Sequence, residues 1–523
     1  MRYCVLIVVA IPIVGCHAQA PNGPSPADQA IPADLAETPI PADLAAASNA
    51  NGHFAIDLYR RLAETESGTN LFLSPFSVST ALTMTAEGAV DQTLDQMLDV
   101  LHVPRGSLAQ IHSGQRGLQS AVVPAVPPEL TAKITALRAQ LKETNARTAA
   151  LERAERRKEA FLSSVAGRKL AEEINTLVSR VSAYELQIAN ALWLEQSYPV
   201  ETNFLSTVQP NYGMVVFPVD FKERPEPVRL EINQWVAEQT HDRIRDLLSP
   251  RQVTPLTRLV LTNTVYFRGD WAEPFEVSRT HREPFQQSLD RSTEVLMMQQ
   301  WNRTTASYAA FTATGDLFPT PLEVRITMKD DDPSLYPDAQ GHTMLSLDYQ
   351  GHKIQMILLV PQSPTGISEL EKSLSHEKLE RWIGQLEHRM VNLSIPKFKL
   401  ESKYELQDTL QSLGMVRCFE IPKDDHQGAQ FDKLTSTQRS EDRLSISAVV
   451  HQTYVDVSEV GTEAAAATAL SEGVSDGDFE TPKTRPFIPI FKANKPFIFL
   501  IRDRKTASIL FLGRYVSPQA LTL

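Results

Sequence analysis

The feature that most constrains the fold is a change of residue type within residues 446–470, near the C-terminus. The first part, through Val457, is rich in β-branched and aromatic residues and is typical of a buried strand. After Gly461 the side chains become small, with four consecutive alanines at Ala464–Ala467. Alanine favours a short helix, whereas the neighbouring threonine and glycine favour an extended segment. A segment without bulk could slide between two existing strands without opening the core far.

Strand-like and helix-like patterns are mixed along the rest of the chain without regular alternation. Strand-like runs occur at 188–194, 214–221, 259–267, 354–360 and 391–400, and helical patterns at 52–65, 74 onward, 91–101, 230–240 and 404–413. This mixture predicts an α+β fold with large antiparallel sheets rather than a doubly wound parallel sheet.

The N-terminus is typical of a targeting signal rather than of a folded element. Residues 1–16 have a positively charged start and a short apolar run, which indicates a secretory signal peptide too short to span a bilayer as a mature helix. Ile13–Cys16 resembles a bacterial lipobox, in which Cys16 would become the lipidated first residue. The alternative is a plain signal peptide with a chance cysteine. The Pro- and Ala-rich residues 17–48 predict an extended spacer, so the domain is expected over 49–523.

Composition and missing motifs limit the classes of function. The three cysteines, Cys4, Cys16 and Cys418, lack metal-site spacing and give no disulfide framework, so Cys418 is expected to be a small buried hydrophobe. The net charge of −12 disfavours nucleic-acid binding. Zinc-protease, nucleophile-elbow, Walker A and dinucleotide-binding motifs are absent from the sequence. We therefore expect no metal, no cofactor and no enzyme activity.

Two segments look like additions to the main domain. Residues 132–180 are dense in Ala, Leu, Glu, Arg and Lys and predict a long solvated helix or a helical hairpin. Their basic cluster is interleaved with glutamates, which favours a salt-bridged face over a polyanion site. Residues 315–341 hold four prolines and an acidic run, and predict a surface excursion.

Several motifs in order resemble the serpin family. The small-residue segment Glu459–Thr468 resembles the hinge of its inhibitory members, and five further motifs follow the family's order over about residues 50–518. These five are Asn70–Ser79, Leu261–Trp271, Asn392–Phe398, Lys495–Phe499 and Phe511–Val516.

The resemblance implies three β-sheets, about nine helices and an exposed reactive loop. It also implies a monomeric inhibitor of serine or cysteine endopeptidases. A protease cleaves the loop, forms an acyl-enzyme, and is trapped when the loop inserts into the large sheet. The hinge carries over to Glu459, Gly461, Thr462, Glu463, Ala464, Ala465, Ala466, Ala467 and Thr468. A cluster where the sheet must part carries over to Ser74, Ser77, Asn263, His451 and Trp271.

The stretch after the hinge departs from the family pattern because it is longer than usual. Counting forward from Glu459 places the scissile bond at Ser475–Asp476, whereas counting back from Lys495–Phe497 places it near Arg485–Pro486. The forward count is preferred, because the length that must insert is set from the hinge, and because proline after Arg485 makes a trypsin-like cut poor. The bonds Lys483–Thr484 and Phe479–Glu480 stay open as further candidates for the scissile bond.

Three other functions stay open at this stage. A non-inhibitory serpin would act as a carrier, chaperone or scaffold, but such forms tend to carry proline or bulky charge in the hinge, unlike this one. An adaptor would bind a partner through residues 132–180. An enzyme is the third alternative. With its lipobox-like start, the chain is expected to be a secreted protein of the cell envelope or extracellular space, anchored to the membrane through lipid on Cys16.

Overall fold

The computed structural model describes residues 39–122, 184–212, 215–240, 242–303, 306–422, 427–435, 444–459 and 484–518, with scattered residues of 133–173. Its α-helices in this part of the chain are α1 (Ala42–Thr65), α2 (Pro75–Ala86), α3 (Asp91–Val100), α4 (Leu108–Val122), α7 (Thr202–Tyr212), α8 (Pro225–Gln239), α9 (Ile367–Ser373), α10 (His376–Ile383) and α11 (Gln407–Ser412). Short 3₁₀ helices cover 277–279, 333–335 and 417–419.

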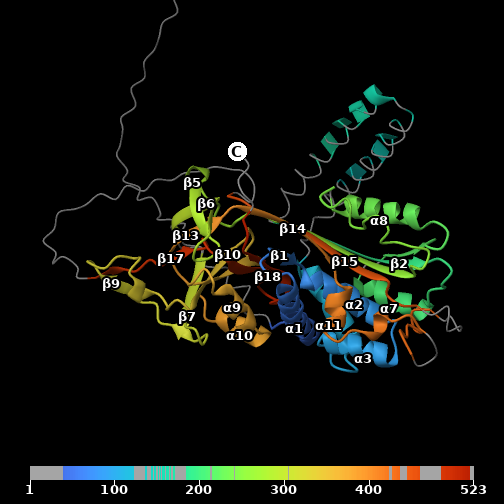
Figure 1. Ribbon diagram of the computed structural model, residues 1–523, viewed down its shortest axis with the longest axis horizontal. Coiled ribbons are helices and arrows are strands. Elements are labelled where there is room, and N and C mark those ends of the chain that lie inside the picture. The colour runs from blue at the N-terminus through green and yellow to red at the C-terminus, as the bar shows by residue number, and fades with distance from the viewer. Residues whose placement is uncertain are drawn as a thin grey trace, which may run out of the picture. The chain divides into compact units, whose positions relative to one another are not determined.

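Three large sheets and one two-stranded sheet organise the described residues (Figure 1). The eight-stranded sheet contains β1 (Leu71–Leu73), β19 (Ile509–Tyr515), β18 (Phe497–Asp503), β11 (Ile354–Pro361), β10 (His342–Asp348), β7 (Ala306–Phe311), β12 (Glu387–His388) and β8 (Leu317–Phe318). The four-stranded sheet contains β17 (Ile490–Lys492), β13 (Val391–Pro396), β6 (Ser292–Arg303) and β5 (Thr280–Gln286).

The five-stranded sheet has the order β14 (Phe398–Glu405), β15 (Ala448–Val457), β4 (Leu259–Gly269), β2 (Tyr184–Glu195) and β3 (Val215–Val219). The two-stranded sheet pairs β16 (Thr484–Pro486) with β9 (Glu323–Arg325). The α+β class with three large sheets, predicted from the sequence, is confirmed.

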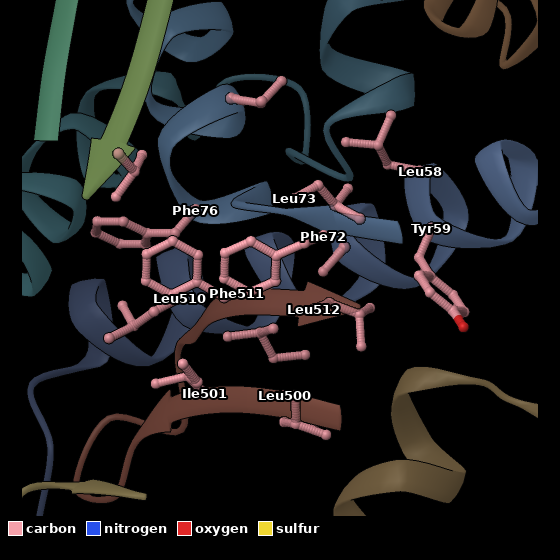
Figure 2. Packing of buried hydrophobic residues seen from close by; sticks show 14 of the residues in the cluster. Leu58, Tyr59, Phe72, Leu73, Phe76, Leu500, Ile501, Leu510, Phe511 and Leu512 are labelled. Atoms are coloured by element: carbon pink, nitrogen blue, oxygen red, sulfur yellow. The ribbon is translucent and has the colours of Figure 1, made fainter. Parts of the chain in front are cut away.

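The core forms where α1 and α2 pack on the eight-stranded sheet at β1, β18 and β19 (Figure 2). The ring of Phe72 stacks on Phe511 at 5.0 Å and on Phe499 at 5.7 Å. Leu58 lies four residues from Phe54 and from Leu62 on α1, and all three are buried, as helical spacing requires. Burial of such side chains is the dominant stabilising contribution to folding.

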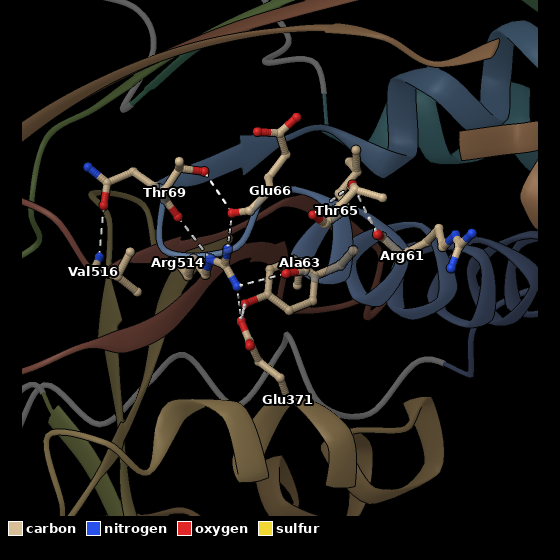
Figure 3. A network of polar contacts seen from close by, with 11 residues as sticks. Arg61, Ala63, Thr65, Glu66, Thr69, Glu371, Arg514 and Val516 are labelled. Carbon is tan, nitrogen blue, oxygen red and sulfur yellow. Dashed lines mark hydrogen bonds and ion pairs between the residues drawn. The ribbon is translucent and has the colours of Figure 1, made fainter. Parts of the chain in front are cut away.

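Arg514 ties the end of β19 to two helices (Figure 3). Its buried guanidinium donates to the carbonyls of Glu66 at 2.6 Å and Thr69 at 2.9 Å, and pairs with the Glu371 carboxylate at 2.9 Å. Tyr59 of α1 donates to the same carboxylate at 2.8 Å. Because the buried guanidinium is satisfied by the Glu371 carboxylate and by carbonyls that follow α1, this network fixes α1 and α9 against the sheet.

Two boundaries predicted from the sequence are wrong. The spacer predicted over 17–48 does not reach residue 48, because α1 begins at Ala42 and already buries Ala47 and Ser48; the alanines there favour helix, and the last proline stands before it. The single run predicted over 391–400 is two strands, β13 and β14, which belong to different sheets and meet at Lys397.

The described residues of the 132–180 segment form two helical arms, which is the hairpin alternative of the prediction. Lys133 pairs with Glu173 at 3.6 Å, and the Thr148 hydroxyl donates to Ser163 at 2.7 Å. The first arm's residue 133 contacts residue 173, and its later residue 148 contacts the earlier residue 163, so the two arms run antiparallel. The predicted excursion at 315–341 contains β8 and β9, the second of which pairs with a strand 160 residues further along the chain.

Candidate functional site: a parallel seam in the five-stranded sheet

The centre of the five-stranded sheet is a seam between β15 and β4. These strands run parallel and pair over seven residues, from Ala448 opposite Val260 to Tyr454 opposite Tyr266. Their outer neighbours, β14 and β2, run antiparallel to them. A chain that leaves β15 and turns back would therefore run antiparallel to both strands of the seam. Antiparallel ladders are slightly more stable per residue than parallel ones, so this geometry favours an added strand at the seam.

A buried polar cluster closes the seam from beneath. The structure brings together Ser74, Ser77, Asn263 and His451, which the resemblance had grouped. The Asn263 amide donates to the Ser77 hydroxyl at 2.5 Å, and the Ser74 backbone N–H donates to His451 Nε2 at 2.9 Å. Ser74 also caps α2, since its hydroxyl accepts from the Ser77 backbone N–H at 3.3 Å. The start of α2 thus holds both strands of the seam.

His451 spans the seam itself, because it lies opposite Asn263 in the β15–β4 register and is fully buried. Its Nε2 accepts from Ser74, which leaves the proton on Nδ1, where it donates to the Asn263 carbonyl at 3.3 Å. Burial lowers the pKa of His451 from 6.5 to about 3, against a smaller opposite effect of the Asn263 carbonyl. The imidazole is therefore neutral near pH 7 and bridges two strands that an entering strand would separate.

Sequence reasoning missed one member of the cluster, Asn190 on β2. Its Oδ1 accepts from the Asn263 amide at 2.6 Å and from the Ser77 hydroxyl at 2.9 Å. Asn190 lies opposite Asn263 in the β2–β4 register. An amide side chain within the apolar run 188–194 was the available signal, because an amide that packs against a sheet needs hydrogen-bond partners.

Trp271 does not belong to this cluster, and the prediction that grouped it there is wrong. It follows the end of β4, eight residues beyond Asn263, which corresponds to about 26 Å along a strand. Its indole N–H donates to the carbonyl of Ser458 at 2.9 Å, and its ring stacks on Tyr349 at 4.6 Å. Trp271 instead closes the opposite end of the seam, where the chain leaves β15.

A small cleft lies at this end of the seam, which we call the seam mouth. Past Tyr454 the β15–β4 pairing stops, while β15 continues to Val457 beside β14, and β4 continues to Gly269 beside β2. The cleft between them is lined by Phe267, Gly269, Trp271, Tyr349, Val455, Asp456, Val457 and Ser458. The seam therefore already begins to part at the end nearest the predicted hinge.

Glu459, the first hinge residue, is anchored beside the seam mouth. Its carbonyl accepts from the Phe275 backbone N–H at 2.8 Å, and its carboxylate pairs with Lys397 at 2.9 Å. Burial acts to raise the pKa of Glu459, but the hydrogen bonds from Lys397 and from its own backbone outweigh this effect and leave the pKa lowered. Glu459 is thus an ionised, buried anchor just beyond the end of β15.

Of the remaining loop residues predicted from the sequence, only Arg485 lies within the described residues. The hinge residues from Gly461 to Thr468, and the scissile candidates Ser475, Asp476 and Lys483, lie outside the described residues. Arg485 is described, and it lies in β16 with its guanidinium paired to Asp330 at 2.7 Å.

Other sequence predictions bear on alternative chemistry. Cys418 is buried, and burial raises the pKa of its thiol, so it packs as a hydrophobe, as predicted. Within the described residues, no group of His, Cys, Asp and Glu is arranged to hold a metal ion. In the same part of the chain, none of the helices has both the length and the apolar character needed to cross a bilayer.

The fold and the seam define an α+β protein with a five-stranded sheet that has a parallel central pair. The family model described as serpin (serine protease inhibitor) matches residues 49–315 and 320–518. The chain therefore belongs to the serpin family, which is named for the inhibition of serine proteases rather than for an enzymatic activity.

Individual relatives agree with this assignment, and solved structures share the fold. The chain is 32% identical to leukocyte elastase inhibitor of Xenopus tropicalis over 475 residues, which cover 90% of this chain and 99% of that protein. It is 32% identical to serpin B6 of Pongo abelii over 474 residues, with 90% and 99% covered. Among solved structures, uncleaved ovalbumin superposes with a TM-score of 0.63 and 23% identity, covering 90% of this chain and 99% of that one. Human thyroxine-binding globulin with bound thyroxine gives 0.64 and 24%, with 91% and 100% covered.

Proposed function

We propose that this protein inhibits serine endopeptidases by loop cleavage and strand insertion, with cysteine endopeptidases as a second target class. The observation that carries the proposal is the parallel seam between β15 and β4, which is continuous in sequence with a hinge of small residues. The relatives named as elastase inhibitors support the same activity.

The energetic argument begins with the ladder. Insertion replaces one parallel β15–β4 ladder with two antiparallel ladders, so the number of backbone pairings rises. Side chains at Thr462, Ala464, Ala466 and Thr468 share one face of the new strand, because strand side chains alternate. These side chains are small and uncharged, so the face that meets the core enters without a large steric or desolvation cost.

The chemistry belongs to the protease. Its nucleophile attacks the carbonyl of the scissile peptide bond, an ester or thioester bond forms, and the new amino terminus leaves with the distal part of the loop. Water would normally hydrolyse this acyl-enzyme and release active protease. Insertion competes with that hydrolysis, because it carries the acylated residue away from the distal segment and deforms the protease before water acts.

The lengths are sufficient for this displacement. From Gly461 to Ser475, an extended strand spans about 50 Å at about 3.3 Å per residue. A compact body of about 400 residues has a diameter of about 55 Å by the usual size scaling. Full insertion would therefore move an acylated protease across about the whole length of the body.

The experiment is incubation with a panel of serine and cysteine endopeptidases, followed by denaturing electrophoresis. Inhibition predicts a covalent complex that survives SDS, with a mass close to the sum of protease and trimmed inhibitor. A chain cleaved by every protease without any trapped complex would instead support the non-inhibitory alternative. One solved relative, thyroxine-binding globulin, holds thyroxine, so a carrier role is the alternative that such a result would leave.

We also propose that the protein is lipid-anchored at the cell envelope through Cys16, on the basis of the lipobox-like Ile13–Cys16. Membrane partitioning of the full chain is expected to be lost in the Cys16→Ser variant, because the acyl chains supply the affinity for the bilayer. The Cys4→Ser variant is the matched control and should partition like the parent. Unchanged partitioning of Cys16→Ser would refute the anchor.

A further inference from the structure

The excursion after β7 holds the far end of the predicted reactive loop. Its strand β9 pairs antiparallel with β16, in the register Thr484–Arg325, Arg485–Val324 and Pro486–Glu323. The Phe487 backbone N–H also donates to the carbonyl of Leu322 at 2.9 Å. Figure 1 shows β9 beside the segment that leads to β17. We call residues 317–336 and their contacts with 484–487 the distal clamp.

The side chain of Arg485 is fastened twice within the distal clamp. One guanidinium nitrogen pairs with Asp330 Oδ1 at 2.7 Å, and another donates to the carbonyl of Met328 at 2.8 Å. The neighbouring hydroxyl of Thr484 donates to the Glu323 carboxylate at 2.8 Å. Charge-assisted bonds of this kind are about twice as strong as neutral ones, so the backbone and the side chain of Arg485 are both occupied.

A small apolar core supports these polar contacts. Phe487 is 3% exposed and packs with Val324 and Leu335, which are 5% and 6% exposed. Arg389 lies over the Phe487 ring at 5.9 Å and donates to the Phe487 carbonyl at 3.1 Å. The same guanidinium nitrogen donates to the carbonyl of Pro321 at 3.0 Å. The distal clamp is therefore a packed element and more than a chance edge contact.

From this arrangement we propose that the distal clamp fixes the C-terminal limb of the reactive loop from Thr484 onward, and so confines inhibitory cleavage to bonds well before that residue. Asp330 and Arg485 are then positioning residues that set where a protease can cut. This inference rests on the proposed inhibitory function for its role, although the clamp itself is a structural feature.

The physical reason is that a protease binds several residues on each side of the scissile bond in an extended form. A cut after residue 483 or after Arg485 would require Thr484–Phe487 to leave β9 and to enter the protease cleft. That release breaks the β16 pairing, the Asp330 ion pair and the Phe487 packing together. The clamp therefore favours the forward count, at Ser475–Asp476, because cleavage near Arg485–Pro486 would first require this release.

Trypsin is the probe, because it selects lysine and arginine, and its products can be mapped by mass. In the full-length Asp330→Ala variant, cleavage at the Lys483–Thr484 bond is expected to be about tenfold faster than in the parent, the change in rate produced by losing about 1.4 kcal/mol of restraint. The Asp331→Ala variant is the matched control. Asp331 is exposed, and its substitution removes the same charge from the adjacent position. It should be cut at the parental rate.

Hydrogen exchange gives a second readout that does not depend on any protease. The amides of 485 and 487 should be protected in the parent and in Asp331→Ala, and should exchange faster in Asp330→Ala. Equal protection and equal cleavage rates in all three proteins would overturn the clamp. Both readouts stand even if no protease is trapped, so failure of the clamp and failure of the inhibitory function are distinguishable. Trapping of a protease by cleavage at Lys483 in the parent would also overturn the clamp.

Discussion

The two ends of the segment 460–483 are held in opposite ways. At the proximal end, Glu459 is fixed by one backbone bond and one ion pair beside the seam mouth, where the strand pairing has already stopped. At the distal end, Thr484–Phe487 are held by strand pairing, by an ion pair and by a buried aromatic ring. This difference favours entry of the cleaved loop from the proximal end, beside Glu459, while Thr484–Phe487 stay on β9.

The largest expected effect on inhibition comes from placing a charged side chain in the proximal part of the loop. In Thr462→Arg, the first side chain to enter the sheet would carry a charge into the core, at a cost of several kcal/mol. Since about 1.4 kcal/mol changes a rate tenfold, insertion should lose to hydrolysis, and an inhibitor should become a substrate. The stoichiometry of inhibition measures this change.

Glu463→Arg is the matched control for that prediction. Its position alternates with 462, so its side chain would lie on the outer face of the inserted strand. It should retain inhibition. If Thr462→Arg trapped a protease as well as the parent does, the proximal end would not be the end that inserts.

Acid should loosen the seam more than the distal clamp. His451 contributes stability that is complete above its unfolded pKa of 6.5 and is lost as the pH falls from there through its folded pKa of about 3. Buried His342 and His376, both with the pKa lowered by burial to about 4, act in the same direction. The clamp residues include no histidine. The free energy of unfolding should therefore fall below pH 6.5, and exchange at the β15–β4 ladder should rise.

The His451→Gln variant isolates the contribution of the seam, because a glutamine amide can accept a hydrogen bond but does not titrate. Its free energy of unfolding, measured from pH 8 to pH 4 by chemical denaturation, should depend less on pH than that of the parent. An identical pH dependence would show that His451 does not control the acid response.

Removing the polar link across the seam should have a smaller effect. Asn263→Ala deletes the amide that bonds to Ser77 and Asn190, and the fully buried Ser77 hydroxyl loses that donor. The expected loss is about 1–3 kcal/mol in the free energy of unfolding. Asn203→Ala, at an exposed position of α7, is the control and should stay within about 0.5 kcal/mol of the parent. A loss no larger than the control's would mean that the cluster does not hold the seam.

The smallest effect is expected at Glu459, the proximal anchor. Lys397→Met removes the partner of the Glu459 carboxylate but keeps most of the side-chain volume. Because Lys397 is 36% exposed, solvent screens the pair, and the loss should be about 1 kcal/mol or less. Hydrogen exchange should nevertheless rise at Phe275, whose N–H bonds to Glu459. Unchanged exchange there would argue that the ion pair does not position the hinge.

The sequence predicted what depends on local pattern and family motifs. The α+β class, the run that became β15, and the four residues Ser74, Ser77, Asn263 and His451 came from such signals, and the structure brings those four together. The sequence could not predict contacts between distant segments that lie outside the family motifs. The pairing of Arg485 with Val324, which lies far earlier in the chain, depends on tertiary register, as does the addition of Asn190 to the cluster. The prediction that placed Trp271 in the cluster was wrong for the same reason. The motif Leu261–Trp271 runs along β4 and past its end, so its members do not all lie beside Asn263.

The most direct test of the central claim is a structure of the chain after cleavage within 460–483. The account predicts a six-stranded sheet, in which residues from Thr462 onward run antiparallel between β15 and β4. His451 and Asn263, now opposite each other across the seam, would be separated by the new strand, while Thr484–Phe487 would remain on β9. A cleaved chain that kept the five-stranded sheet, with His451 still opposite Asn263, would contradict the account.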